Sequence, residues 1–315
     1  MDLAEGVLAG DRRAVARAIS VVEGGGAAGA ALVDRLYPRT GRAWRIGLTG
    51  PPGAGKSTLA DRLIGHFRDA GQRVGVVAVD PSSPFTGGAL LGDRVRMDER
   101  TAGEAGGVFI RSLAARGALG GLSEATEAVG DVLDAAGYDV VLIETVGVGQ
   151  GEIDVAEAAD TVVVVVVPES GDAVQAMKAG LMEIADVFAV NKAERPEAGR
   201  MVRALRQMLH LRPPPEDGWA VPVVKTSAVE GAGIGSLVAA LEGHRAHLAA
   251  RWDETRTARL RRRVRQLVEA GWRARFWDAR RSALDAALAG LEAADRTPHR
   301  LAARLLEREG ADREG

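Results

Sequence analysis

The chain has 315 residues, of which 46% are hydrophobic, so it can bury a substantial core in one α/β domain with extensions or in two domains. It contains no cysteine, which excludes disulfides, iron–sulfur clusters, zinc–thiolate sites and thiol catalysis. The formal net charge of −2 gives no overall attraction to nucleic acid or to an anionic membrane.

The first 41 residues predict an N-terminal helical arm. Their pattern is helical, is broken by Gly24 to Gly26 and ends at Pro38. The N-terminus lacks the basic-then-apolar order of a secretory signal, and no apolar run approaches the roughly 20 residues of a membrane span. We therefore expect a cytoplasmic protein without a membrane partner.

Residues 42–235 alternate between strand and helix patterns. Apolar runs predict strands near 44–49, 73–79, 108–111, 138–144, 161–167, 186–191 and 221–225. The run from Val162 to Val167 is apolar at every position, as is typical of a strand buried on both faces. The pattern predicts an α/β domain with a doubly wound, mostly parallel sheet.

The segment after the first predicted strand, GPPGAGKS, fits the phosphate-loop spacing G-x-x-x-x-G-K-[ST]. Its glycines let backbone amides turn onto a β-phosphate, Lys56 brings a positive charge to the β and γ oxygens, and the Ser57 hydroxyl can complete a Mg²⁺ shell. This predicts a nucleoside triphosphate site. Its expected phosphate-binding residues are Gly50, Pro51, Pro52, Gly53, Ala54, Gly55, Lys56, Ser57 and Thr58.

Carboxylates follow two other predicted strands, at the sheet edge where ligands bind in open parallel sheets. Asp80 ends the second strand, and Asp93 lies in the long glycine-rich loop after it, which is suited to close on a γ-phosphate. The alternative is that Asp80 only starts a turn. Glu144 ends the fourth strand, and the amide of Gly147 can contact the γ-phosphate until hydrolysis. We predict metal ligands at Ser57, Asp80, Asp93 and Glu144, and catalytic roles for Lys56, Asp93, Glu144 and Gly147.

The sixth predicted strand leads into Asn191-Lys192-Ala193-Glu194, which resembles the guanine-specifying NKxD motif of GTPases. The carboxylate of that motif accepts from guanine N1–H and the 2-amino group, a donor pair that adenine lacks. Glu194 replaces the usual Asp and adds one methylene, so the sequence leaves open whether guanine specificity is relaxed. Ser227 and Ala228, after the last strand, resemble the supporting base-contact motif.

Residues 236–315 predict a C-terminal helical extension, because strand patterns cease and apolar residues fall at helical spacing. The aromatic residues Trp252, Trp272, Phe276 and Trp277 either pack an interface or close a small core, and both interpretations stay open. The arginines between 256 and 265 could attract nucleic-acid phosphates, but acidic residues flank them. A solvated or interfacial face is therefore favoured over nucleic-acid binding.

Longer strings resemble the MeaB/ArgK family, a metallochaperone-like branch of P-loop GTPases that has ExxG in place of DxxG. They are VDPSSPFTGGALLGDRVRM at 79–97, FIRSLAARGALGG at 109–121, ETVGVGQGE at 144–152 and GDAVQAMKAGLMEIADVFAVNKAE at 171–194. The resemblance covers about residues 42–235. It implies that a signalling loop corresponds to residues 148–154.

This resemblance implies a GTPase that binds GTP or GDP with Mg²⁺, and we expect its turnover to be slow without a partner. The implied partner is an adenosylcobalamin-dependent acyl-CoA mutase of the methylmalonyl-CoA mutase type, whose cofactor loading the GTPase gates and which it protects from inactivation. A homodimer built partly through residues 236–315 is also implied. Spacing assigns no arginine finger or water-orienting glutamine, although Arg94 and Gln150 are candidates.

Two other nucleotide-dependent classes compete with this interpretation. A small-molecule or protein kinase would need an acceptor pocket and a catalytic base, and no segment supplies an obvious one. A nickel-delivery GTPase would hold its metal through Cys and His, whereas this chain has no Cys and five scattered His. The kinase is the stronger of these two alternatives.

Overall fold

The computed structural model describes seven stretches of the chain. They are residues 2–80, 107–114, 121–145, 151–168, 180–213, 217–289 and 297–311. The chain divides into two compact units, one of residues 1–259 and one of residues 260–315. The first unit holds the β-sheet, and the described part of the second is helical.

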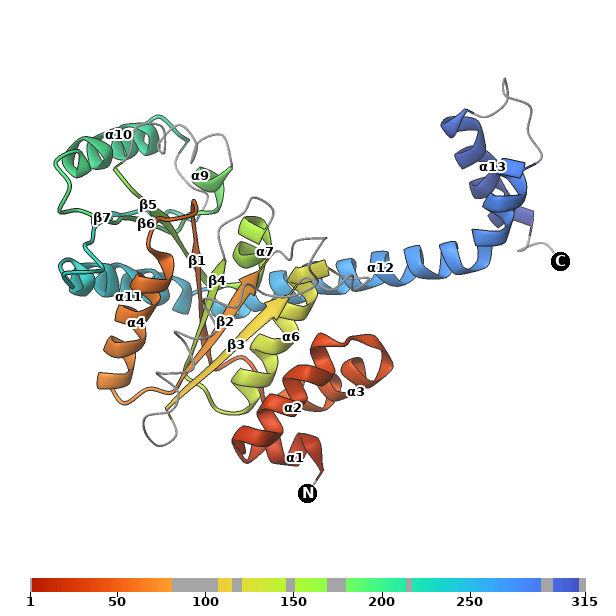
Figure 1. Cartoon of the computed structure of the whole chain (residues 1–315), viewed down its shortest axis with the longest axis horizontal. Helices are drawn as coiled ribbons and strands as arrows, with labels where there is room; N and C mark the ends of the chain where they lie inside the picture. Colours follow the sequence, from red (N-terminus) through yellow and green to blue (C-terminus); the bar gives the residue numbers. More distant parts are fainter. Residues whose placement is uncertain are drawn as a thin grey trace. The chain divides into compact units, whose positions relative to one another are not determined.

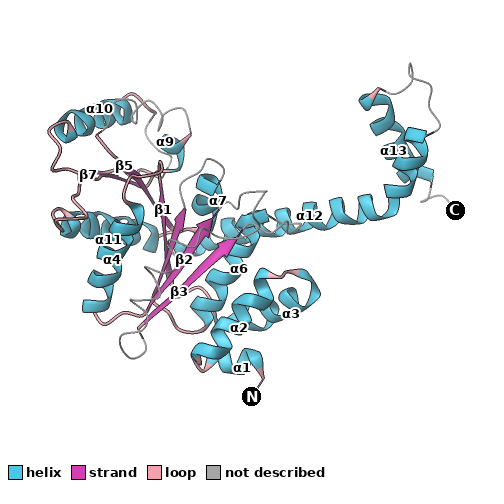
Figure 2. Cartoon of the chain, viewed as in Figure 1, coloured by secondary structure: helices cyan, strands magenta, loops and turns pink. Residues whose placement is uncertain are grey.

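Seven strands form one sheet in the described part of the first unit (Figures 1 and 2). They are β1 (Trp44–Thr49), β2 (Val74–Asp80), β3 (Val108–Ala114), β4 (Val140–Thr145), β5 (Thr161–Val166), β6 (Val187–Val190) and β7 (Val223–Lys225). Their order is β3-β2-β4-β1-β5-β6-β7, and all adjacent pairs are parallel. The predicted doubly wound α/β fold is confirmed.

The third strand extends furthest beyond its predicted end. The sequence pattern ends it at residue 111, whereas β3 continues to Ala114. It continues because β3 pairs with β2 along its whole length, from the Val74–Val108 pair to the Asp80–Ala114 pair. Pairing within the sheet extends the strand through polar residues that weaken the sequence pattern.

Alternate residues of each strand point to opposite sides of the sheet. Both faces therefore carry apolar side chains, and helices cover both of them. On β4, Val140 and Leu142 join the core under one set of helices, and Val141 and Ile143 join the core under the other. The first set is α4 (Lys56–Asp69) and α11 (Ile234–Ala249). The second set is α6 (Gly121–Ala135), α7 (Gly151–Ala158), α9 (Leu181–Ile184) and α10 (Ala198–His210).

The N-terminal arm is helical, as its pattern predicts. It consists of α1 (Leu3–Leu8), α2 (Arg12–Glu23), α3 (Gly26–Leu36) and the 3₁₀ turn η1 (Tyr37–Arg39). The buried face of α2 carries Val15, Ala18, Ile19 and Val22, at helical spacing, and it shares a core with α6. The division of the chain into domains at residues 41 and 235 stays a prediction.

The C-terminal region contains the helices α12 (Trp252–Ala289) and α13 (Pro298–Ala311). Within residues 260–315, Arg280 Nε of α12 donates to Leu305 O of α13 at 2.9 Å, and the Leu301 and Leu305 side chains are buried. Over the described residues, none of the helices combines the length and the apolar character that crossing a membrane requires.

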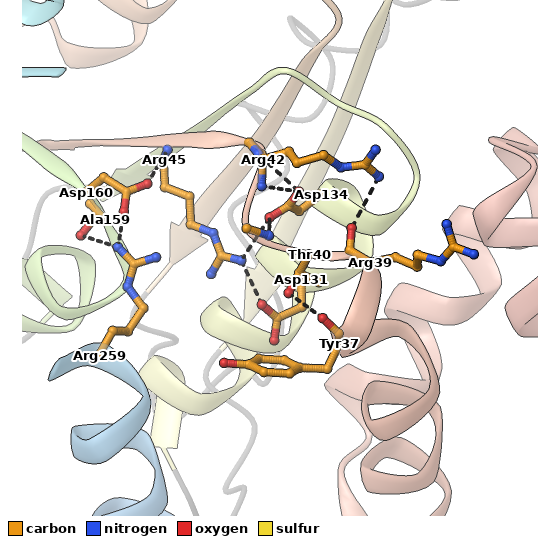
Figure 3. Close-up of polar contacts among 12 residues, drawn as sticks. Tyr37, Arg39, Thr40, Arg42, Arg45, Asp131, Asp134, Ala159, Asp160 and Arg259 are labelled. Carbon is orange, nitrogen blue, oxygen red and sulfur yellow. Dashed lines mark hydrogen bonds and ion pairs between the residues drawn. The ribbon is translucent and has the colours of Figure 1, made fainter. Parts of the chain in front are cut away.

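A buried ionic cluster lies where β1 and β5 begin, and we call it the amino-end network (Figure 3). Its members are Arg45, Asp131, Asp134, Asp160 and Arg259. Arg45 donates to Asp131 Oδ1 at 2.7 Å, and its backbone N–H donates to Asp160 Oδ2 at 2.8 Å. Arg259, near the start of α12, also pairs with the Asp160 carboxylate.

Asp134 connects this network to the chain segment that enters β1. Its carboxylate accepts from the backbone N–H groups of Gly41 at 2.6 Å, Arg42 at 3.2 Å and Ala43 at 3.0 Å. Burial opposes the charge of Arg45, but the Asp131 carboxylate and its neighbours raise the pKa of the guanidinium above its usual value. The network therefore fixes the start of β1, the strand that carries the phosphate loop at its other end.

Candidate functional site

The phosphate loop leaves β1 at the topological switch point of the sheet. β1 lies between β4 and β5, and the chain turns from β1 toward β2 on one side while β5 to β7 extend on the other. Ligands bind at such a point, outside the carboxyl ends of the strands. The loop and the beginning of α4 therefore lie where a nucleotide is expected in this fold.

At two positions of the loop, neighbouring atoms lie so close to the backbone that only glycine fits. Gly50 has φ 136°, and a Cβ built there would lie 2.1 Å from Val165 O. Gly55 has φ 86°, and a Cβ there would lie 2.4 Å from Asn191 Nδ2. The loop thus packs its own backbone against β5 and against the Asn191 amide, which leaves no room for side chains at these two positions.

Lys56 is the first residue of α4, and its side chain lies against the loop. Its Nζ donates to Gly50 O at 2.8 Å and to Pro51 O at 3.0 Å, and the residue is 6% exposed. The first turn of a helix presents backbone N–H groups that have no acceptor within the helix, and its dipole favours an anion. Phosphate oxygens placed here would meet both the N–H groups and the ammonium.

Ser57 and Glu144 lie together beside the loop. Ser57 Oγ donates to Glu144 Oε1 at 2.5 Å, and Glu144 is 2% exposed. Strand register places Glu144 opposite Leu48 of β1 and Ala78 of β2, at the carboxyl end of the sheet. A hydroxyl and a carboxylate are the oxygen donors that Mg²⁺ prefers, so this pair fits the predicted metal position.

Other residues predicted for the metal and the γ-phosphate fall partly or wholly outside the described residues. The backbone of Asp80 ends β2 and pairs with Ala114, but its side chain is not among the described parts. Asp93, Gly147, Arg94 and Gln150 lie outside the described residues, as does the first part of the predicted signalling loop, 148–150. Among the predicted catalytic and metal residues whose side chains the structure describes, Lys56, Ser57 and Glu144 lie together beside the loop.

A cavity of about 540 Å³ adjoins the Ser57–Glu144 pair. Val76, Val108 and Ile110 of β2 and β3 form an apolar part of its lining. Charged side chains of α4 also line it, namely Asp61, Arg62, Arg68 and Asp69, so the cavity is partly polar.

The predicted base motif follows β6, and its first residue bridges two loops. Asn191 is 2% exposed; its Nδ2 donates to Ala54 O at 2.8 Å, and its Oδ1 accepts from Ala228 N at 3.0 Å. The Thr226 hydroxyl also donates to Asn191 Oδ1, at 3.3 Å. Asn191 thus ties the phosphate loop to the 226–228 segment, a structural role that its place in the motif did not reveal.

Two later residues of the motif have unusual properties, Lys192 in its backbone conformation and Glu194 in the pKa of its carboxyl group. Lys192 has φ 56°, the one positive φ at a non-glycine position among the described residues. Such strain concentrates at functional sites. Glu194 is exposed, and hydrogen bonding from the Ser227 side chain lowers the pKa of its carboxyl group. A charged carboxylate is therefore available beside Ser227 and Ala228, as base recognition would require.

Sequence reasoning missed one residue near the base motif. Arg62 of α4 donates to Ala228 O from Nε at 2.7 Å and to Val229 O from a terminal nitrogen at 2.6 Å. The chain is rich in arginine, with 41 Lys and Arg residues of which only four are Lys, so nothing in the sequence singles out Arg62. Its acceptors are backbone carbonyls, which leave no residue-type signature.

Comparisons with known proteins agree with this geometry. A family model described as "Methylmalonyl Co-A mutase-associated GTPase MeaB" matches residues 15–281. A protein of Pyrococcus abyssi that is named as a GTPase is 49% identical over 271 residues, 85% of this chain and 83% of that protein. GTPase ArgK of Escherichia coli is 39% identical over 232 residues, 71% of this chain and 70% of ArgK.

A solved structure supports the same likeness in three dimensions. The protein called "LAO/AO transport system kinase" matches with a TM-score of 0.73 and 26% identity, over 98% of this chain and 96% of that one. The family model also extends beyond the nucleotide-binding strands into α2 and α12. The likeness therefore includes helices on both sides of the sheet domain, where sequence reasoning found similarity only in type.

Proposed function

Because the chain belongs to the MeaB family of P-loop GTPases, we propose that its GTP hydrolysis serves a partner enzyme, an adenosylcobalamin-dependent acyl-CoA mutase of the methylmalonyl-CoA mutase type. Its proposed role is to gate the loading of the cofactor and to protect the mutase from inactivation. The observation that carries this proposal is the match of the mutase-associated family model over residues 15–281. That match includes the phosphate loop, Glu144 and the base motif.

The proposed nucleotide mode follows from the loop and its neighbours. Residues 50–58 hold the phosphates of GTP or GDP, with the Lys56 ammonium moving from the carbonyls of Gly50 and Pro51 to phosphate oxygens. Ser57 and Glu144 hold Mg²⁺, together with the predicted ligands Asp80 and Asp93. A bound Mg²⁺ would neutralise charge that develops on the β- and γ-phosphates.

In the same proposal, the base lies between the Asn191–Glu194 segment and the Ser227–Ala228 segment. The charged Glu194 carboxylate, held by Ser227, accepts from guanine N1–H and the 2-amino group. Bound adenine would leave this carboxylate without its donors. Nucleotide selection therefore depends on how firmly the two segments are held together.

Hydrolysis measured with and without a purified mutase tests the partner proposal. An adenosylcobalamin-dependent methylmalonyl-CoA mutase should raise the GTP turnover rate by roughly tenfold or more, since partner proteins complete incomplete GTPase sites. The two proteins should co-elute with a nonhydrolysable GTP analogue and separate, or bind more weakly, with GDP. Equal turnover with and without every such mutase would contradict the partner role.

The kinase alternative is not favoured, because the relatives at 39–49% identity are named GTPases. The same assay separates the two activities. With γ-labelled GTP, a GTPase releases all label as inorganic phosphate. Label found on a metabolite or on a protein side chain would support a kinase.

We also propose that a second copy of the chain covers one side of α12. Apolar residues along this helix are 43–63% exposed at helical spacing, and they are Leu260, Val264, Leu267, Val268 and Trp272. A charge at the most exposed position, Val268→Glu, should convert a dimer to a monomer in sedimentation equilibrium. The matched variant Arg273→Glu should stay dimeric, and a wild-type chain that sediments as a monomer would contradict the proposal.

A further inference from the structure

Arg62 joins the phosphate-loop helix to the segment that follows β7. Two of its nitrogens donate to consecutive backbone carbonyls, Ala228 O at 2.7 Å and Val229 O at 2.6 Å. Hydrogen bonds from a charged donor are shorter and stronger than neutral ones, and two acceptors in sequence fix both position and orientation. Because α4 begins in the phosphate loop, the two hydrogen bonds of Arg62 fix the position of the 228–229 backbone relative to that loop.

The segment held by Arg62 is a tight turn. Ser227 N donates to Ala232 O at 2.9 Å, and Gly231 N donates to Ser227 O at 2.8 Å. Ala228 is 2% exposed, whereas Val229 is 73% exposed, so the turn packs on one side only. Packing on the buried side alone would leave Val229 and the residues after it free to move together.

The strand before this turn gives it weak support. β7 has three residues, lies at the edge of the sheet and pairs with β6. A short edge strand fixes the following loop less firmly than a long central one does. Backbone bonds of Thr226 to Val190 O and from Ala193 N continue this pairing by one residue, and side chains from other elements add to it.

Two contacts supply that support from different directions. Asn191 holds Ala228 N through its Oδ1 and holds Ala54 O of the phosphate loop through its Nδ2. Arg62 holds the carbonyl side of the same residue, Ala228. Phosphate loop, α4, Arg62, Ala228 and Asn191 thus form a closed ring of covalent and hydrogen-bonded links.

We propose that Arg62 is a positioning residue for guanine recognition. Through its bonds to the backbone of the turn, it sets Ser227 and Ala228 against Asn191 and Glu194 without itself reading the base. The inference rests on the proposed role of Asn191, Glu194 and Ser227 in reading the base. Its consequence is that base selectivity depends on a side chain of the phosphate-loop helix.

Removing the two bonds should alter nucleotide selection more than turnover. In Arg62→Met, which keeps the aliphatic stem, we expect KM for GTP to rise roughly tenfold, as expected for losing hydrogen bonds to a charged donor, with kcat changed less than about twofold. ITP lacks the 2-amino group, so its affinity should change less and the GTP-over-ITP preference should fall. Arg62→Lys keeps the charge but not the two-point geometry, and it should restore part of the preference.

Arg68→Met is the matched control, because Arg68 lies on the same helix but packs against Gly107 instead of the 227–232 turn. It should leave the GTP-over-ITP preference unchanged. If Arg62→Met is unfolded at the assay temperature, the Arg62→Lys variant carries the test by a fall in the preference. Thermal unfolding measured for each variant separates these cases.

Two results would overturn the inference and are distinguishable from each other. If the wild type prefers GTP over ITP and Arg62→Met or Arg62→Lys keeps that preference, Arg62 is only a structural link and the base assignment survives. If the wild type binds GTP and ITP equally, the assignment of the base to Glu194 fails, and the role of Arg62 fails with it.

Discussion

The two ends of the parallel sheet hold buried charge in different ways. At the amino end, Arg45 is 4% exposed and its partner Asp131 is 2% exposed, and the two are joined by a 2.7 Å bond. At the carboxyl end, Lys56 is 6% exposed, and its described bonds go to the neutral carbonyls of Gly50 and Pro51. A buried cation therefore donates to a carboxylate at the amino end, and a buried cation donates to two backbone carbonyls at the carboxyl end.

This difference indicates different roles for the two ends of the sheet. Removing one partner of a buried ion pair leaves an uncompensated charge, so the amino end is sensitive to any change of its residues. A lysine that donates to loop carbonyls can also donate to phosphate oxygens placed at the start of the same helix. We therefore propose that the amino end serves stability and that the carboxyl end serves ligand binding.

The largest expected effect is at the amino end. Asp131→Ala removes the charged partner of the buried Arg45 and should lower the free energy of unfolding by about 3–5 kcal/mol. Urea-induced unfolding followed by circular dichroism measures it. Asp2→Ala breaks an exposed ion pair with Arg35 and should change stability far less. Equal losses in the two variants would remove the contrast between buried and exposed pairs.

At the carboxyl end, the same kind of change should affect activity instead of folding. Lys56→Ala should lower kcat/KM for GTP about 10²- to 10³-fold, as expected when a charged donor to the transferred phosphate is lost, with little change in the unfolding midpoint. Lys225→Ala, at the end of β7, is the control and should keep hydrolysis within about twofold. A Lys56 variant that loses stability but keeps activity would reverse the proposed division between the two ends.

Sequence reasoning recovered the carboxyl end better than the amino end. The G-x-x-x-x-G-K-[ST] spacing located Lys56 and Ser57, and the end of an apolar strand located Glu144, which the structure joins to Ser57. Each of these residues lies at a fixed offset from a strand or a turn, so the sequence can locate it, and its role in nucleotide binding stays a prediction.

The amino-end network leaves no such pattern. Arg45 lies in an apolar strand, and its partner Asp131 is 86 positions away in a helix of mixed composition. Arg62 bonds to Ala228 and Val229, which lie 166 and 167 positions further along the chain. No sequence pattern predicts these bonds either. Long-range pairs depend on which elements become neighbours in the fold, and that is known only once the sheet order is known.

A third prediction concerns pH and two residues near the amino ends of β5 and β6. Burial raises the pKa of Asp186 to about 7 and lowers the pKa of His244 to about 4, from ordinary values of 3.8 and 6.5. Asp186 accepts from Val162 N at 2.7 Å, and His244 Nδ1 lies 3.0 Å from Thr161 Oγ1. Between about pH 4 and 6.5, Asp186 binds more protons in the folded state and His244 binds more in the unfolded state.

The two groups therefore act in opposite directions on stability. As pH rises through this window, Asp186 lowers the free energy of unfolding and His244 raises it, so the two largely cancel in the wild type. His244 Nε2 lies 3.5 Å from Asp186 Oδ1, so a change at one residue also alters the surroundings of the other. Asp186→Asn removes the contribution that falls with pH, and its free energy of unfolding should rise by about 2 kcal/mol between pH 5 and 6.5 relative to the wild type. His244→Gln should show the opposite slope. Unfolding curves at several pH values measure both, and parallel pH profiles in all three proteins would contradict the assignment.

The smallest expected effect lies in the arm that packs on α6, the helix that carries Asp131 and Asp134. Asp11 caps α2 by accepting from Ala14 N at 2.7 Å. Asp11→Ala should therefore cost about 1 kcal/mol in the free energy of unfolding, while Asp11→Asn keeps the capping oxygen and should cost much less. GTP hydrolysis at saturating nucleotide should be unchanged in both, because the arm shares its core with the face of the sheet opposite α4. A loss of hydrolysis in Asp11→Ala without unfolding would show that the arm reaches the carboxyl end, and the proposed separation of the two ends would then be wrong.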